Sequence, residues 1–128
     1  MSIAFKNIYA ITILLVTTFI VTFEMSVVMP LAPFIADTYQ IPSYQVTYLN
    51  LGYAFFGMLA PILGFNADRI GLKKMILLAA MLFAFGAFLV GSQTVVLAYI
   101  LGRALMGLAY FSFLAILLTY LSLMVSKE

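Results

Sequence analysis

Four long apolar runs decide what this sequence can fold into. They cover about residues 8–36, 44–65, 75–91 and 94–124, and short polar connectors separate them. A helix needs about 20 apolar residues to cross a hydrocarbon core that is about 30 Å thick. Because 66% of the residues are hydrophobic and only 8% are charged, a soluble fold of this length could not shield its apolar surface from water. The sequence therefore predicts an all-α membrane protein, with one transmembrane domain over residues 1–128 that has four spans and contacts the lipid bilayer.

Cysteine and histidine are both absent, which narrows the chemistry of the chain. Without them it has no disulfides, no thiol chemistry and no metal site built on Cys or His ligands, so we expect neither a metal nor another cofactor. The sequence contains no nucleophile–base pair and no phosphate-binding loop, so an enzyme is not expected. The formal charge of +2 is too small to indicate binding to nucleic acid.

The basic residues outside the apolar runs all lie on one side of a four-span topology. These residues are Lys6, Arg69, Lys73, Lys74 and Lys127. The connectors on the opposite side contain no lysine or arginine. Because positively charged loops favour the cytoplasmic side, we expect a multi-pass protein of the plasma (inner) membrane with both termini in the cytoplasm.

Two charged residues, Glu24 and Arg103, lie inside the predicted spans. A charged side chain near the centre of a bilayer costs about 2.5–3.5 kcal/mol on insertion scales, so such residues usually have a function. Hydrocarbon favours the protonated form of a carboxyl group, which makes Glu24 a candidate proton carrier. The alternative for Glu24 is a structural role, as a carboxyl that is protonated or hydrogen-bonded between helices.

The two charges are expected at similar depths in the membrane. With a rise of about 1.5 Å per residue, Arg103 lies about 14 Å from the turn at residues 92–93, and Glu24 about 16 Å from the outer end of its helix. Arg103 cannot lose its charge, so it must find an anion, a carbonyl group or water. A pair between Glu24 and Arg103, direct or through water, is therefore our hypothesis for a site of proton or substrate coupling.

Small residues indicate where the predicted helices approach each other closely. Gly57 lies in the second run, and Gly107 lies one turn after Arg103 in the fourth. Small side chains allow tight backbone contact, which is one way in which membrane helices associate. We therefore predict that both glycines pack against a neighbouring helix, although glycine is also common in membrane helices in general.

A charged, glycine-containing stretch joins the second and third runs. Residues 64–74 read Gly-Phe-Asn-Ala-Asp-Arg-Ile-Gly-Leu-Lys-Lys. This stretch resembles the signature loop between the second and third helices of major facilitator superfamily (MFS) transporters. The matching positions are Gly64, Ala67, Asp68, Arg69, Gly71, Lys73 and Lys74, whereas Asn66, Ile70 and Leu72 depart from the pattern. Two further stretches resemble family patterns: Arg103-x-x-x-Gly107, and the proline-containing residues 29–36 at the end of the first run.

This resemblance implies a secondary transporter and the N-terminal part of an MFS-type helical bundle. It is most similar to the branch of drug:proton antiporters, so the expected partners are protons and a small-molecule substrate for efflux. In such proteins Asp68 would latch a cytoplasmic gate at a helix N-terminus of the other half, and Gly64 would permit the close approach. Arg69 and Lys73 would support the charge network. The alternative is a simple turn, with an Asp cap and lysines that only fix topology.

The chain is shorter than a complete MFS transporter, which affects whether it could transport alone. MFS transporters have twelve or more helices in two halves, each half built from inverted three-helix repeats. We therefore expect a fragment that inserts without transporting alone and that needs the missing C-terminal helices of the same transporter. Two alternatives stay open. One is a complete four-span dimeric transporter that resembles the small multidrug resistance family, and the other is a membrane subunit without transport activity.

Overall fold

The computed structural model describes the backbone of residues 3–92 and 95–125. Within these ranges the side chains of residues 3–7, 10, 63–64, 66–68 and 120–125 lie outside the description. All regular elements in the described backbone are helices. They are α1 (Ile3–Val28), α2 (Ala32–Tyr39), α3 (Ser43–Leu49), α4 (Leu51–Gly57), α5 (Ala60–Ile70), α6 (Leu72–Gly91) and α7 (Val96–Val125).

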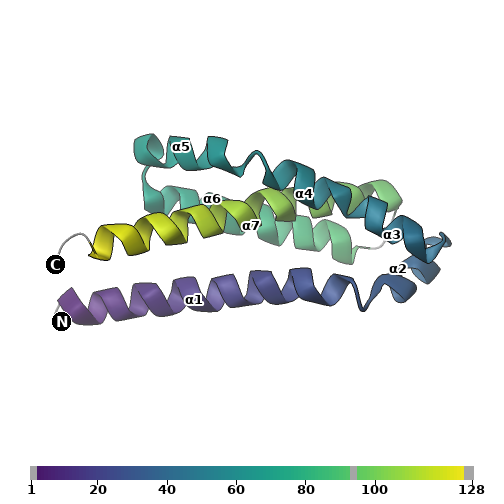
Figure 1. Cartoon of the computed structure of the whole chain (residues 1–128), viewed down its shortest axis with the longest axis horizontal. Coiled ribbons are helices and arrows are strands. Elements are labelled where there is room, and N and C mark those ends of the chain that lie inside the picture. The colour runs from purple at the N-terminus through teal and green to yellow at the C-terminus, as the bar shows by residue number, and fades with distance from the viewer. Residues whose placement is uncertain (1–2, 93–94, 126–128) are drawn as a thin grey trace.

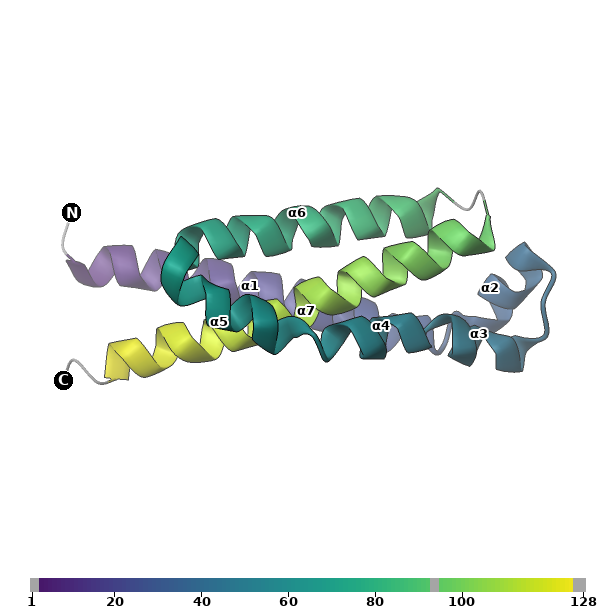
Figure 2. The same cartoon turned by 90° about the horizontal axis from the view of Figure 1, so that it is seen from above.

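The helices form an elongated bundle with two distinct ends (Figures 1 and 2). The long helices α1, α6 and α7 run along its length, and α3, α4 and α5 follow one another in line beside α7. The start of α1, the turn between α5 and α6, and the end of α7 lie at one end. Helices α2 and α3 lie at the other end, together with the end of α6 and the start of α7. The chain therefore passes back and forth along the bundle, as alternating membrane spans require.

Prolines end the first long helix earlier than the sequence analysis expected. The predicted span over residues 8–36 is not one helix, because α1 ends at Val28 and α2 begins at Ala32. Pro30 has no N–H group to donate to the carbonyl of Ser26, and its ring disfavours the helical conformation of the preceding residue. Pro33 lies in the first turn of α2, where a missing N–H group costs nothing because that position has no intrahelical acceptor.

The predicted span over residues 44–65 is likewise divided, into α3, α4 and α5. At the first break the backbone N–H of Asn50 is shared between the carbonyls of Val46 and Thr47, each 3.2 Å away. The second break, between α4 and α5, precedes Pro61, which cannot donate to the carbonyl of Gly57. None of the three pieces alone has the length of about 20 residues that a membrane crossing needs.

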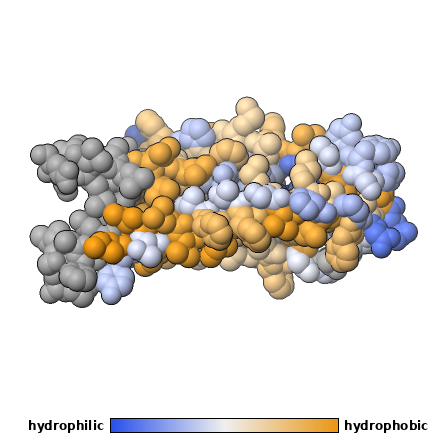
Figure 3. Space-filling model, turned by 60° about the horizontal axis from the view of Figure 1, so that its bottom comes forward, coloured by the Kyte–Doolittle hydropathy of each residue, from blue (hydrophilic) through white to orange (hydrophobic). Residues whose placement is uncertain are grey.

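Three of the described helices are long and apolar enough to cross a membrane. Their membrane-length segments are Ile11–Val28, Leu72–Gly91 and Val96–Thr119. The length and composition of individual helices thus support three spans, and they do not confirm the predicted count of four. Hydrophobic residues cover most of the visible side of the bundle, and hydrophilic ones gather at the end where α2 and α3 lie (Figure 3).

The charged stretch over residues 64–74 is not the loop that the sequence analysis expected. Helix α5 continues through Ile70 and α6 begins at Leu72, so Gly71 alone separates them. Gly71 has a φ of 97°, which residues with a side chain rarely adopt. A glycine at this position therefore permits the tight reversal between the two helices.

Replacing Gly71 with alanine should destabilise the protein by about 1–3 kcal/mol, because the backbone there is strained for any residue with a Cβ atom. The free energy of unfolding in bicelles would measure this. Gly91→Ala is the matched control, since a Cβ atom at Gly91 meets nothing within 4 Å. Equal stability of the Gly71→Ala and wild-type proteins would show that the reversal does not need glycine.

Helix α7 forms the centre of the bundle. Within its membrane-length segment 56% of the residues are buried, compared with 11% for α1 and 17% for α6. Val21 of α1, Ala79 of α6 and Phe113 of α7 form a buried cluster, and Met75 and Ile116 form a second one between α6 and α7. Because α7 packs against α1, α4 and α6, its polar residues lie at interfaces with these helices.

Glycines let α7 approach its neighbours closely, at three places. A Cβ atom at Gly107 would lie 2.0 Å from the carbonyl oxygen of Tyr53 in α4, and one at Gly57 would lie 2.3 Å from the ring of Phe111. The third contact pairs Gly102 with Gly86 of α6, where a Cβ atom on either glycine would lie within 2.7 Å of the other's carbonyl oxygen. The structure thus places Gly57 and Gly107 at helix contacts and adds the Gly86–Gly102 contact, which the sequence analysis did not identify.

Candidate functional site

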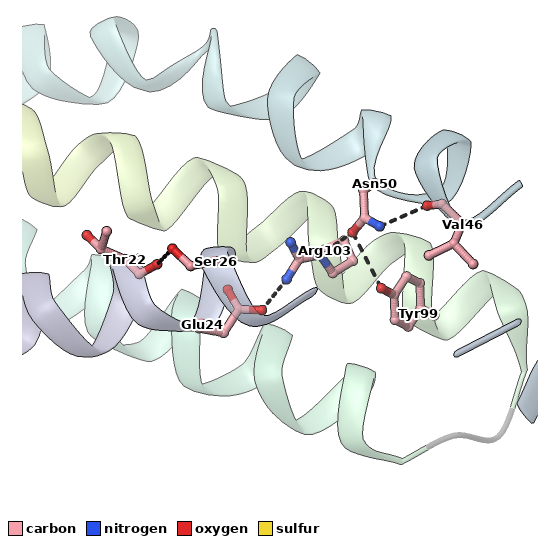
Figure 4. Close-up of polar contacts among 7 residues, drawn as sticks. All are labelled: Thr22, Glu24, Ser26, Val46, Asn50, Tyr99 and Arg103. Atoms are coloured by element: carbon pink, nitrogen blue, oxygen red, sulfur yellow. Dashed lines mark hydrogen bonds and ion pairs between the residues drawn. The ribbon is translucent and has the colours of Figure 1, made fainter. Parts of the chain in front are cut away.

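The structure brings Glu24 of α1 and Arg103 of α7 into contact. A guanidinium nitrogen of Arg103, Nη1, donates a hydrogen bond to Oε1 of Glu24, and the two side chains form an ion pair (Figure 4). The Arg103 side chain is 3% exposed and the Glu24 side chain 24%. Because a buried arginine stays charged, the nearby carboxylate compensates a charge that the apolar surroundings cannot stabilise.

The broken segment α3–α4 supplies two further contacts to Arg103. Asn50 lies between α3 and α4, and its Oδ1 accepts a hydrogen bond of 2.7 Å from Nε of Arg103 (Figure 4). The same oxygen lies 3.4 Å from the hydroxyl group of Tyr99, which is one turn before Arg103 in α7. The ring of Tyr53 in α4 lies against the guanidinium group, with its centroid 4.6 Å from Cζ, as in a cation–π contact.

Not every buried polar atom near the pair has a partner. Among the described residues, Oε2 of Glu24 and the hydroxyl oxygen of Tyr53 make no hydrogen bond, although both atoms are buried. A buried acceptor without a donor is costly in an apolar interior. Oε2 of Glu24 is therefore free to take a proton or to accept a hydrogen bond from a bound molecule.

A cavity of about 440 Å³ lies beside the ion pair. Glu24 and Arg103 form part of its wall, and most of the remaining lining is apolar or aromatic. The lining comes from α1, α2, α6 and α7 and the residues next to them, and includes Phe23, Val27, Phe34, Tyr39, Val90 and Tyr99. An apolar cavity with a few convergent polar groups is the usual form of a small-molecule site.

The residues of the predicted gate motif lie elsewhere, at the turn between α5 and α6 (Figure 2). Arg69 is in the last turn of α5, and Lys73 and Lys74 are exposed in the first turn of α6. The positive end of the helix dipole disfavours cations there, so these lysines do not serve to stabilise α6. Gly64 and Asp68 lie within α5, but only the backbone is described at these two positions. Their predicted role at a gate stays a prediction.

Sequence analysis missed three members of the site. Asn50 is a polar residue in the second apolar run, but the sequence analysis did not assign it to the site, and it singled out neither Tyr53 nor Tyr99. A signal was present, because Tyr99 and Arg103 are four residues apart and so lie on one face of a helix. Asn50 and Tyr53 have the same relation at a spacing of three.

Comparison with known proteins identifies the family. The family model of the Major Facilitator Superfamily matches residues 14–128, a range that includes Glu24, Asn50, Arg103 and the α5–α6 turn. The chain belongs to the Major Facilitator Superfamily. Members of this family are transporters and not enzymes, and this agrees with the apolar helices of a membrane protein. No curated protein and no solved structure matches the chain.

Proposed function

We propose that this MFS chain is part of a proton-coupled exporter of small molecules, in which Glu24 carries the proton and Arg103 is its counter-ion. The observation that supports this most is the buried ion pair in the wall of an apolar cavity, within a family of transporters. Ionisable residues inside membrane proteins commonly mark ion or substrate pathways. The assignment to antiport and efflux is part of the proposal.

Protonation of Glu24 would change the contact between α1 and α7. In its ionised form Glu24 pairs with Arg103, so protonation removes the charge that attracts the guanidinium group. A lipophilic cation in the cavity would favour the ionised form instead, with Oε2 as a free acceptor. Proton and substrate would therefore compete for Glu24, which is the requirement for exchange of one against the other.

We propose that the α5–α6 turn faces the cytoplasm and forms part of a gate. Two observations support this orientation. Arg69, Lys73 and Lys74 lie at this turn, and positive charge favours the cytoplasmic side. The start of α1 and the end of α7 lie at the same end of the bundle as the turn. Asp68 would latch the gate, with Gly64 permitting close approach of the partner helix.

Proton release on ligand binding tests the proposed coupling. At a pH acidic enough to protonate Glu24, we expect the purified chain in nanodiscs to bind tetraphenylphosphonium and to release protons, detected with a pH indicator at weak buffering. Glu24→Gln should abolish this release because glutamine carries no titratable proton. Asp37→Asn, which changes an exposed carboxyl in α2, should leave it unchanged. Equal release from Glu24→Gln, or none from the wild type, would contradict the proposal.

We further propose that other helices of the same transporter complete the substrate path. Large apolar side chains of α1 such as Ile13 and Phe19 are more than half exposed and can be covered by lipid or by such helices. We therefore expect this chain alone to insert into vesicle membranes. We do not expect such vesicles to show proton-driven flux of a lipophilic cation. Measurable flux in those vesicles, lost in Glu24→Gln, would show that this chain transports without additional helices.

A further inference from the structure

The orientation of the Asn50 side chain is fixed by α3, the helix that precedes it. Its amide nitrogen Nδ2 donates a hydrogen bond of 2.8 Å to the carbonyl oxygen of Val46, one turn earlier. With the nitrogen held in this way, Oδ1 points across the helix interface toward α7 (Figure 4). The break between α3 and α4 at this residue therefore presents a fixed acceptor to the neighbouring helix.

Two donors of α7 meet this acceptor. Nε of Arg103 lies 2.7 Å from Oδ1, and the hydroxyl group of Tyr99 lies 3.4 Å from it. Arginine can only donate, so the oxygen of the amide, and not its nitrogen, has to face Arg103. The hydrogen bond to Val46 and the hydrogen bond from Arg103 thus require the same orientation of the Asn50 amide.

Asn50 and Glu24 hold different parts of the guanidinium group. Glu24 accepts from Nη1, whereas Asn50 accepts from Nε, and the ring of Tyr53 covers the face of the group. If Glu24 is neutral, Arg103 stays charged and buried, and it then depends on the remaining contacts. Those contacts come from the α3–α4 segment and do not involve α1.

We propose that Asn50 is a positioning residue for Arg103. Together with Tyr53, it aims Nη1 of the guanidinium group at Glu24, and it keeps Arg103 in place while Glu24 is neutral. The relevance of this clamp to coupling rests on the proposed function, but the clamp itself is measurable without transport. The clamp holds the Arg103 guanidinium group in place against the α3–α4 segment. The ion pair between Arg103 and Glu24 of α1 is therefore the contact that forms and breaks.

The sequence offers a selective measurement, because Arg69 and Arg103 are its two arginines. In the chain labelled with 15N-arginine and placed in nanodiscs, NMR resolves two Nε–H groups and their rates of hydrogen exchange. We expect slow exchange for Arg103 and fast exchange for the exposed Arg69. Asn50→Leu should accelerate exchange of the Arg103 Nε–H about tenfold or more, because a hydrogen bond to a charged group is lost.

Three comparison variants separate positioning from general stability. Asn50→Asp keeps an acceptor oxygen, so exchange of the Arg103 Nε–H should stay slow. Glu24→Gln should also leave it slow, since Glu24 accepts from Nη1 and not from Nε. Thr47→Leu, an exposed position in α3, is the matched control and should leave both arginine signals as in the wild type.

Two outcomes would overturn the inference. One is slow exchange of the Arg103 Nε–H in a folded Asn50→Leu variant. The other is accelerated exchange in Glu24→Gln, which would show that Glu24 and not Asn50 holds Arg103. If Asn50→Leu fails to fold, the pair of Asn50→Asp and Glu24→Gln decides, because both must keep slow exchange. Lack of ligand-induced proton release, with the expected exchange pattern intact, would contradict only the proposed function.

Discussion

Gly107→Ala will disrupt the packing of α7 against α4 and lower the free energy of unfolding by about 3 kcal/mol. The added Cβ atom would lie 2.0 Å from the carbonyl oxygen of Tyr53 and 2.7 Å from its carbonyl carbon. These are backbone atoms, which cannot rotate away as a side chain can. The two helices would have to separate, and the separation would also disturb Tyr53 and Asn50 at the ion pair.

Gly52→Ala is the matched control for this experiment. Gly52 lies in α4 at the same interface, but there a Cβ atom would meet its neighbours at 3.6–3.9 Å, which is ordinary van der Waals contact. Alanine also favours a helix over glycine by about 1 kcal/mol, so this variant should be as stable as the wild type or more stable. Unfolding of both variants in bicelles measures the difference. Equal stability of Gly107→Ala and wild type would contradict the close approach of α4 and α7.

Removing the carboxyl group at position 24 should destabilise the protein more than removing the arginine at position 103. Glu24→Leu leaves a buried cation without its counter-ion, which costs about 3 kcal/mol. Arg103→Leu leaves a carboxyl group that can take up a proton and become neutral, so its cost should be smaller. Because the two residues interact, the double variant should lose less stability than the sum of the single variants.

The free energies of unfolding of the wild type, the two single variants and the double variant form a complete cycle. Met25→Leu, at an exposed position next to Glu24, controls for changes in α1 that do not touch the pair. Additive losses would show that Glu24 and Arg103 do not stabilise each other. A greater loss in Arg103→Leu than in Glu24→Leu would contradict the asymmetry between a group that can be neutralised and one that cannot.

Hydropathy predicted two of the long helices closely. The predicted spans over residues 75–91 and 94–124 correspond to α6 (Leu72–Gly91) and α7 (Val96–Val125). The same argument failed at residues 64–74, because hydropathy reports where apolar residues end and not where backbone hydrogen bonding ends. Charged residues in water can continue a helix, and α5 does so as far as Ile70.

The helix breaks were readable in principle but were not predicted. Pro30 and Pro61 each remove a backbone donor, and a break lies next to each of these two prolines, whereas Pro33 lies in the first turn of α2, where the missing donor costs nothing. The break at Asn50 has no proline. It involves a side-chain amide that bonds to the carbonyl of Val46, and a sequence alone does not determine whether such a bond forms.

Counting residues along an unbroken first span placed Glu24 and Arg103 at one depth. The helix in fact ends at Val28, and the structure nevertheless has the two side chains in contact. The other residues of the site could not be predicted in this way. The depth of a residue in the membrane depends on the number of residues before it, whereas the neighbour that its side chain faces depends on how the helix is rotated about its axis. In a helix that is apolar all round, the hydrophobic pattern does not fix that rotation. Asn50, Tyr53 and Tyr99 therefore entered the site only when the packing of α4 against α7 was known.

The central claim, that Glu24 and Arg103 form an ion pair inside the membrane, can be measured as a distance. Glu24 and Glu128 are the two glutamates, and Arg69 and Arg103 the two arginines. Solid-state NMR on the chain in lipid, labelled at glutamate Cδ with 13C and at arginine Nη with 15N, detects their dipolar coupling. We predict a coupling that corresponds to an ion pair, within about 4 Å, and its loss in Glu24→Gln. A wild-type chain without that coupling, or a coupling that persists in Glu24→Gln, would contradict the account.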